Sequence, residues 1–289
     1  MHCLLLLLAI AFAWLLRQGI SYSMGLKTGQ PPTWSFRWQL TLANFLLPPL
    51  AIAFTALAVL YMGSHGHMLG APVGRLGYGL AISLLGGTTV LFAYLSWQSL
   101  RSRRQIQALP TVVLQQSQVR QLETAVPFAA QIGLWHSELV VSQGLTETLT
   151  PAQIKAVLAH EAAHRYYRDT FYFFWLGGLR RLTAWLPHTE TLWQELIFLR
   201  ELRADRWAAN RVDPLLLAES LVQVAQAAVA PPSDCWAMLT DRTQVERLEE
   251  RIEALIAHAP TESSSHLQWL WLSGLAVGLP LLTIPFHTF

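Results

Sequence analysis

One stretch decides how the rest of the chain is interpreted: residues 150–164, with the sequence TPAQIKAVLAHEAAH. Thr150 can cap a helix, Pro151 suits the first helical position, and Gln153 completes a capping box. An apolar stripe follows at helical spacing, made by Ile154, Val157 and Leu158. The stretch therefore predicts an amphipathic helix that presents its last five residues on a fixed framework.

Those last five residues place two imidazoles and a carboxylate in metal-binding order. His160 and His164 are four residues apart, so on a helix they project from one face and can bind the same ion. Glu161 follows the first histidine and can take a proton from a metal-bound water. The sequence predicts a catalytic site for one zinc ion, with Glu161 as the general base.

A catalytic zinc needs a third protein ligand, and we expect it from Glu201. Glu201 lies in a second predicted helix, Trp193–Ala209, and Asp205 follows one turn later on the same face. Asp205 can accept a hydrogen bond from a zinc-bound imidazole and fix its tautomer. Glu195 and Glu190 are the fallback ligands. Alternatively, these acids pair with the neighbouring arginines as a solvated helix face.

The composition is that of a membrane protein. Hydrophobic residues make up 53% of the 289 residues and charged residues 13%, against roughly 25% charged in soluble domains. Every Asp and Glu lies between Glu123 and Glu262. Residues 101–266 therefore form a charged block that is long enough for one domain with its own core.

Apolar stretches surround this block. Three predicted membrane helices fill residues 1–100, at about 1–16, 40–62 and 76–100, and a fourth lies in residues 267–289, at 267–286. The first stretch has the length of a signal peptide, but it lacks a basic leading region. We therefore expect it to be a retained helix.

Basic residues in the short loops predict the orientation. Arg101, Arg103 and Arg104 directly follow the third span, whereas the 63–75 loop carries only Arg75. This places residues 101–266 in the cytoplasm and both termini outside.

The cytoplasmic block begins with strand-like runs at 111–114, 126–132 and 138–142. Helical patterns follow them. The predicted fold is thus a mainly α integral membrane protein of four transmembrane helices, with an α+β domain inserted between the third and the fourth.

The motifs resemble those of gluzincin-type membrane zinc peptidases. The resemblance rests on Pro127–Leu145, on Leu158–His164 with Asp169, and on Glu201 with Asp205. The predicted order of spans and domain is similar to the BlaR/MecR sensor-transducer family, while Glu201–Asp205 resembles the HtpX-like peptidases. BlaR/MecR proteins carry an extracellular penicillin-binding sensor after the fourth span, whereas this sequence stops at Phe289. The resemblance is therefore to a short member of that family, without a C-terminal sensor domain.

The resemblance implies roles that agree with those derived above. It makes His160, His164 and Glu201 the zinc ligands, Glu161 the general base and Asp205 a support for a ligand histidine. It also implies that an edge strand pairs with the substrate backbone. This strand would supply Phe128, Ala129 and Ala130.

Three functions are compatible with these features. The first is cytoplasmic proteolysis of a BlaI/MecI-like repressor, of the protein itself, or of both, at a bacterial inner membrane. The second is HtpX-like quality control of membrane proteins, and the third is a signalling scaffold with structural zinc. Lipid and a peptide or protein substrate are the expected partners, and no direct nucleic-acid binding is expected.

Overall fold

The structure, a computed structural model, describes residues 1–25, 33–65, 67–68, 71–72, 74–227, 247–257, 281, 284–285 and 287–288. The helices are α1 (His2–Gly25), α2 (Trp34–Met62), α3 (Arg75–Gln107), α4 (Gln143–Thr148), α5 (Pro151–Tyr166), α6 (Asp169–Leu182), α7 (Thr189–Ala209), α8 (Pro214–Ala227) and α10 (Leu248–Ile256). The strands are β1 (His67–Met68), β2 (Ala71–Pro72), β3 (Thr111–Leu114), β4 (Ser117–Leu122), β5 (Ala129–Ile132), β6 (Glu138–Ser142) and β7 (His287–Thr288). They divide between two compact units.

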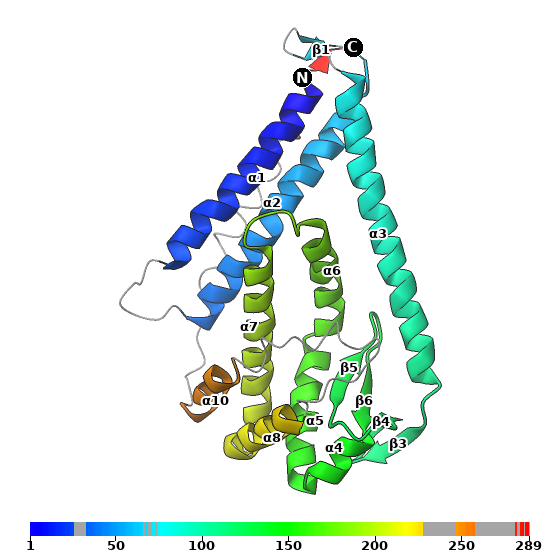
Figure 1. Cartoon of the computed structure of the whole chain (residues 1–289), viewed down its shortest axis with the longest axis vertical. Helices are drawn as coiled ribbons and strands as arrows, with labels where there is room; N and C mark the ends of the chain where they lie inside the picture. Colours follow the sequence, from blue (N-terminus) through cyan, green and yellow to red (C-terminus); the bar gives the residue numbers. More distant parts are fainter. Residues whose placement is uncertain are drawn as a thin grey trace. The chain divides into compact units, whose positions relative to one another are not determined.

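The first unit comprises Met1–Tyr94, Gly178–Leu196 and Glu262–Phe289. Within it α1 and α2 run side by side (Figure 1). Small and apolar side chains fill their contact, among them Leu6, Ala56 and Val59. Here the buried Arg17 of α1 donates to the carbonyl of Phe45 at 3.3 Å and to the hydroxyl of Thr189 at 3.2 Å. Apolar packing and these hydrogen bonds together hold α1 in place.

Two helices of the described chain, α2 and α3, are long and apolar enough to cross a membrane. They contain the predicted spans 40–62 and 76–100. Only 11% of the apolar window of α3 is buried within the protein, which suits a helix whose surface lies in lipid. The predicted span 1–16 lies within α1, whose apolar part, His2–Gln18, is shorter. The fourth predicted span, 267–286, lies almost entirely outside the described residues.

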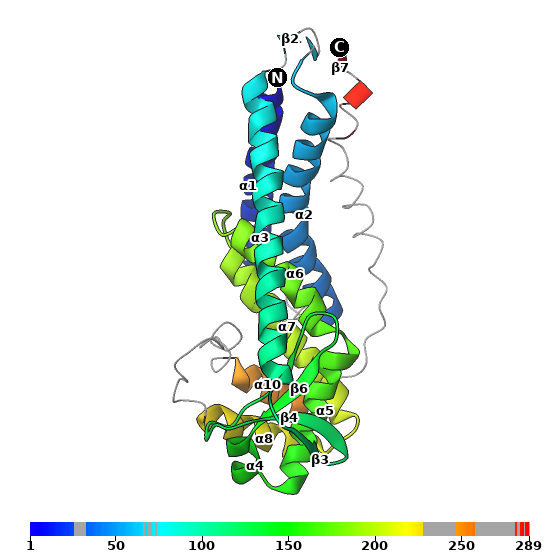
Figure 2. The same cartoon turned by 90° about the vertical axis from the view of Figure 1, so that its right-hand side faces the viewer.

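The second unit comprises Leu95–Gly177 and Ile197–Thr261 and contains a mixed four-stranded sheet in the order β3-β4-β6-β5. Strands β4 and β6 are parallel, and the other pairs are antiparallel. The sheet lies beside α4 and α5 (Figure 2). Among the described residues β5 pairs with β6 alone, so it is an edge strand of this sheet.

The sheet differs from the sequence prediction in two places. Strand β4 was not predicted, because Ser117–Leu122 is mostly polar and buries only Val119. Strand β5 begins at Ala129 rather than at Val126. Pro127 explains the later start, since proline has no N–H to donate to a β-ladder.

Two apolar clusters hold α5 in its position. One side packs on the sheet through Val141, Ile154 and Val157. The other side meets α8 and α10 through Ala156, Leu217 and Leu255. Burial on both sides fixes the helix that carries the two histidines.

Candidate metal centre and active site

The predicted start of α5 is formed as expected. The Thr150 hydroxyl accepts a hydrogen bond from the Gln153 N–H, and the Gln153 side chain accepts one from the Thr150 N–H. This capping box satisfies backbone donors that a helix end otherwise leaves unpaired. The helix then continues without interruption to His160, Glu161 and His164, which lie in its last two turns.

Three potential ligand atoms converge beside α5. The Nε2 atoms of His160 and His164 are 3.1 Å apart. Oε2 of Glu201, from α7, lies 3.3 Å from the first and 3.7 Å from the second. The structure thus brings together the two histidines and the acid that the sequence selected as third ligand.

The opposite ring nitrogens of both histidines face carboxylates. Nδ1 of His164 lies 2.8 Å from Oδ2 of Asp169 in hydrogen-bonding geometry. Nδ1 of His160 lies 2.8 Å from Oδ1 of Asp205, although this contact is not aligned as a hydrogen bond. A proton on each Nδ1 leaves the lone pair of each Nε2 directed at the common point. From the sequence, this supporting role was predicted for Asp205 alone.

Arginines contact Glu201 and both supporting carboxylates. Arg200 contacts Oε1 of Glu201 at 2.7 and 2.9 Å, while Oε2 faces the histidines and also lies 3.6 Å from Arg251. Arg203 pairs with Asp169, and Arg251 of α10 forms a two-pronged bond with Asp205 at 2.7 and 2.8 Å. Such paired geometry is the strongest form of carboxylate recognition by arginine.

Arg251 was not predicted as part of the site. It follows Asp205 by 46 residues, and it lies in a helix whose charged pattern is that of an ordinary surface helix. No local spacing could connect it to the histidines. Its position becomes apparent only from the packing of α10 on α8 through Ile252 and Leu255.

The buried charges shift one another's protonation. Burial alone would lower the pKa of His160, but contacts with Asp205 and Glu201 outweigh it and raise that pKa to about 10. Burial acts to raise the pKa of Glu201, yet Arg200 and the histidines hold it well below its usual range. Likewise, Arg251 keeps the pKa of Asp205 low against the effect of burial. The cluster therefore stabilises a positive charge between the two imidazoles and Glu201.

Glu161 is held differently from these acids. Its Oε2 accepts a hydrogen bond of 3.0 Å from the backbone N–H of Gln131, in the edge strand β5. Burial raises the pKa of its carboxyl, and the nearby histidines only partly oppose this. A raised pKa makes a carboxylate a better proton acceptor, which suits a general base.

The donor set fits a zinc ion. Tetrahedral zinc with ligands at about 2.0–2.1 Å requires ligand atoms spaced by roughly 3.4 Å, and the three observed spacings are 3.1, 3.3 and 3.7 Å. His160, Glu161 and His164 also offer ligand atoms within 4.8 Å of one another. Three protein ligands leave a fourth position for water or substrate.

The fallback acids make other contacts. Glu195 pairs with Arg37 at 2.6 Å, and Glu190 pairs with Arg180 at 2.8 Å. Of the three acids, Glu201 is the one that contacts the histidines. Glu201 also pairs with Arg200, as the alternative prediction of acid–arginine pairs on this helix expected.

The predicted substrate strand lies at the open edge of the sheet. The backbone of Phe128 faces β6. Its carbonyl accepts a hydrogen bond from the Ser142 N–H, and its N–H donates one to the Ser142 hydroxyl. Backbone groups alternate in direction along a strand, and Gln131 points outward to Glu161. The backbone of Ala129 therefore also faces the open edge, whereas that of Ala130 faces β6.

The contact between Arg251 and Asp205 leads to a stability prediction. We expect Arg251→Met to destabilise the folded protein by about 3 kcal/mol, because it leaves a buried carboxylate without its partner. For a chain of this size the Tm should fall by roughly 6–12 °C, measured by thermal unfolding in detergent.

Arg206→Met is the matched control, since Arg206 lies on α7 and is half-exposed. Its substitution should leave the Tm nearly unchanged. Equal Tm values for the two variants would show that Arg251 does not hold the site together.

Comparison with known proteins agrees with this geometry. No curated protein matches the chain. Residues 112–197 match the family model for peptidase family M48, whose members are zinc-dependent. The match includes the sheet except for Thr111, and α5 with Glu161, and it ends before Glu201 and Asp205. Residues 112–197 therefore carry the sequence pattern of a zinc metallopeptidase domain.

Proposed function

We propose that this protein is a membrane-bound zinc endopeptidase that performs regulatory proteolysis in the cytoplasm. The convergence of His160, His164 and Glu201 beside the buried Glu161 carries the proposal. A structural metal site would have no use for a base placed in this way, so the geometry argues against the non-catalytic scaffold.

The residues of the chain divide the work of peptide hydrolysis. Zinc, when bound by His160, His164 and Glu201, supplies Lewis-acid polarisation of the scissile carbonyl and of the attacking water. Glu161 accepts a proton from that water and transfers it to the nitrogen of the leaving amine. Asp169 and Asp205 keep both imidazoles oriented, so that the ligand atoms need no rearrangement during the reaction.

The substrate binds as an added strand on β5. The backbone of Ala129 can exchange hydrogen bonds with an extended peptide, and Phe128 and Ala130 flank it. The N–H of Gln131 fixes Glu161 beside the same edge. A peptide on this edge therefore passes directly in front of the general base.

Peptide cleavage with chelation tests the reaction. Purified protein in detergent should hold one zinc ion and cleave a fluorogenic casein substrate. Treatment with 1,10-phenanthroline should abolish cleavage, and one equivalent of zinc should restore it. Metal-free protein that cleaves at full rate would exclude the proposed chemistry.

We propose a BlaI/MecI-like repressor, the protein itself, or both as the substrate. The resemblance of the motifs and of the span order to BlaR/MecR proteins supports this choice. The alternative is quality control of membrane proteins. It is favoured by the small side chains of Ala129 and Ala130, because such an edge recognises backbone rather than particular side chains.

Coexpression distinguishes the two substrates. The protein is produced together with a winged-helix repressor or with a misassembled membrane protein, and both are followed by immunoblot. Loss of the repressor alone supports regulation, and loss of the membrane protein alone supports quality control. Each loss must be absent in the Glu161→Gln variant.

The proposed orientation places residues 101–266 in the cytoplasm, because basic residues cluster after the third span. An alkaline phosphatase reporter fused after Arg104 should be inactive, and one fused after Phe289 should be active. A green fluorescent reporter should give the reverse pattern. The opposite result at both positions would exclude a cytoplasmic repressor as the substrate.

A further inference from the structure

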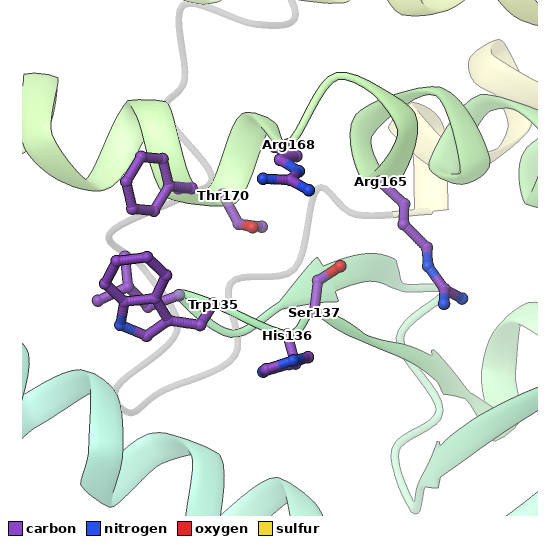
Figure 3. Close-up of a pocket in the computed structure, with 8 residues that line it drawn as sticks. Trp135, His136, Ser137, Arg165, Arg168 and Thr170 are labelled. Atoms are coloured by element: carbon purple, nitrogen blue, oxygen red, sulfur yellow. The ribbon is translucent and has the colours of Figure 1, made fainter.

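A small pocket lies next to the proposed substrate strand, within the second unit. Its volume is about 220 Å³. One side is formed by the loop after β5, with Trp135, His136 and Ser137, and the other by the end of α5 and the start of α6, with Arg165, Arg168 and Thr170 (Figure 3). This volume is below the roughly 300–1,000 Å³ of pockets that enclose whole small ligands. It suits a single side chain.

The pocket is positively charged and lacks an internal counter-charge. None of the described residues that line it is Asp or Glu. The side chains of Arg165 and Arg168 form no hydrogen bond or ion pair with any residue of the described part of the chain. Two guanidinium groups therefore offer their donors to an incoming anion.

The nearest acids in sequence are bound elsewhere. Glu138 follows Ser137 directly, but it pairs with Arg120 at 2.6 Å. Asp169 follows Arg168, but its carboxylate is held by His164 and Arg203. Neither acid is available to neutralise the pocket.

An aromatic wall accompanies the charge. The rings of Trp135 and Phe171 lie 5.0 Å apart, and Trp135 is 71% exposed. Such a wall packs against the methylene groups of a side chain, while the arginines bind its charged end. Thr170 and Ser137 add hydroxyl groups to the same lining. This combination fits a glutamate or aspartate side chain.

The pocket is continuous with the strand that is proposed to bind substrate. Gly133 turns the chain after β5 with a φ of 131°, and a Cβ there would lie 2.4 Å from the carbonyl oxygen of His136. Leu134 begins the pocket lining three residues after Gln131, a span of at most about 10 Å. A peptide on β5 can therefore place a side chain here, a few residues from the bond next to Glu161.

We propose that this pocket, defined by Trp135, His136, Arg165, Arg168 and Thr170, is a specificity subsite for an acidic residue of the substrate. The proposal rests on the proposed peptidase function and adds a substrate preference to it. The edge strand then binds the backbone of the substrate at Ala129, and the pocket that follows Ile132 binds an acidic side chain of the same substrate.

A set of paired peptides tests the subsite. The peptides are quenched fluorescent nonapeptides with a central phenylalanine and alanine at most other positions. Each peptide carries a single Glu, at a different position in each, and has a counterpart with Gln at that position. Wild-type protein should prefer Glu at one position by about tenfold in kcat/KM. Arg165→Gln and Arg168→Asn should each reduce this preference to less than threefold, because each removes a guanidinium group that faces the acidic side chain.

Two choices keep the test specific. Asparagine replaces Arg168 because the backbone there has a φ of 54°, which asparagine tolerates better than most residues. The control is Arg104→Gln, at an exposed arginine outside the pocket, which should keep the full preference. A preference that survives both pocket variants, or no preference in wild type, would overturn the subsite.

Binding separates this proposal from the peptidase function. In the Glu161→Gln protein, fluorescence anisotropy should show that the preferred Glu peptide binds about tenfold more tightly than its Gln counterpart. This difference should disappear in the double variant that also carries Arg165→Gln. Cleavage without preference removes the subsite and keeps the peptidase. Tighter binding without any cleavage by wild type keeps the subsite and removes the peptidase. If the pocket variants instead lose binding to phosphatidylglycerol vesicles and keep the Glu preference, the pocket binds lipid and the proposal is wrong.

Discussion

Glu161→Gln should lower the rate of peptide cleavage by about a thousandfold while the protein keeps one zinc ion per chain. General acid–base groups contribute about 10²–10⁴-fold to such reactions, and glutamine cannot accept the proton. Zinc should remain because the proposed ligand atoms belong to His160, His164 and Glu201. The measurements are initial rates on a fluorogenic peptide and elemental analysis of the same sample.

Glu147→Gln provides the matched control for this result. Glu147 is exposed on α4 and bonds to Gln143, so its substitution should change neither rate nor metal content. Full activity in Glu161→Gln would assign proton transfer to another group. Loss of zinc in that variant would instead make Glu161 a ligand.

Glu201→Gln should weaken zinc binding by more than about 100-fold. Loss of a supporting group alone typically costs 10–100-fold in metal affinity, and Glu201 is itself proposed as the source of a ligand atom. Gln preserves the shape of the side chain but removes the charge that faces both histidines. Competition against a fluorescent zinc chelator measures the effect.

Glu195→Gln is the internal comparison, since Glu195 lies on the same helix and pairs with Arg37. We expect its zinc affinity to equal that of wild type. If Glu195→Gln lost zinc while Glu201→Gln retained it, the third ligand would have been misassigned. Equal retention in both variants would place the third ligand outside α7.

The features that could be predicted from sequence are those that depend on local spacing. The capping box at Thr150 fixes where α5 begins, and helical periodicity then places His160 and His164 on one face. The same periodicity places Glu201 and Asp205 on one face of α7. The features that could not be predicted depend on tertiary packing: Arg251 reaches Asp205 from α10, and Asp169 turns back to His164.

The strands show the same division. Strand β6, Glu138–Ser142, buries the consecutive β-branched residues Val140 and Val141, so its pattern is evident. Strand β4 is polar because most of its side chains remain outside the core, and its pairing with β3 and β6 defines it. Propensity alone could not detect such a strand.

The net charge of the buried cluster predicts how many metal ions it can bind. Its carboxylates are Glu161, Asp169, Glu201 and Asp205, and its guanidinium groups are Arg200, Arg203 and Arg251. With neutral imidazoles, four negative charges against three positive ones leave an excess of one negative charge. One divalent ion converts this to an excess of one positive charge, which in a site of low dielectric repels any further cation. We therefore expect the arginine frame to limit the proposed centre to a single ion, whereas a two-metal site would require additional carboxylates in place of these arginines.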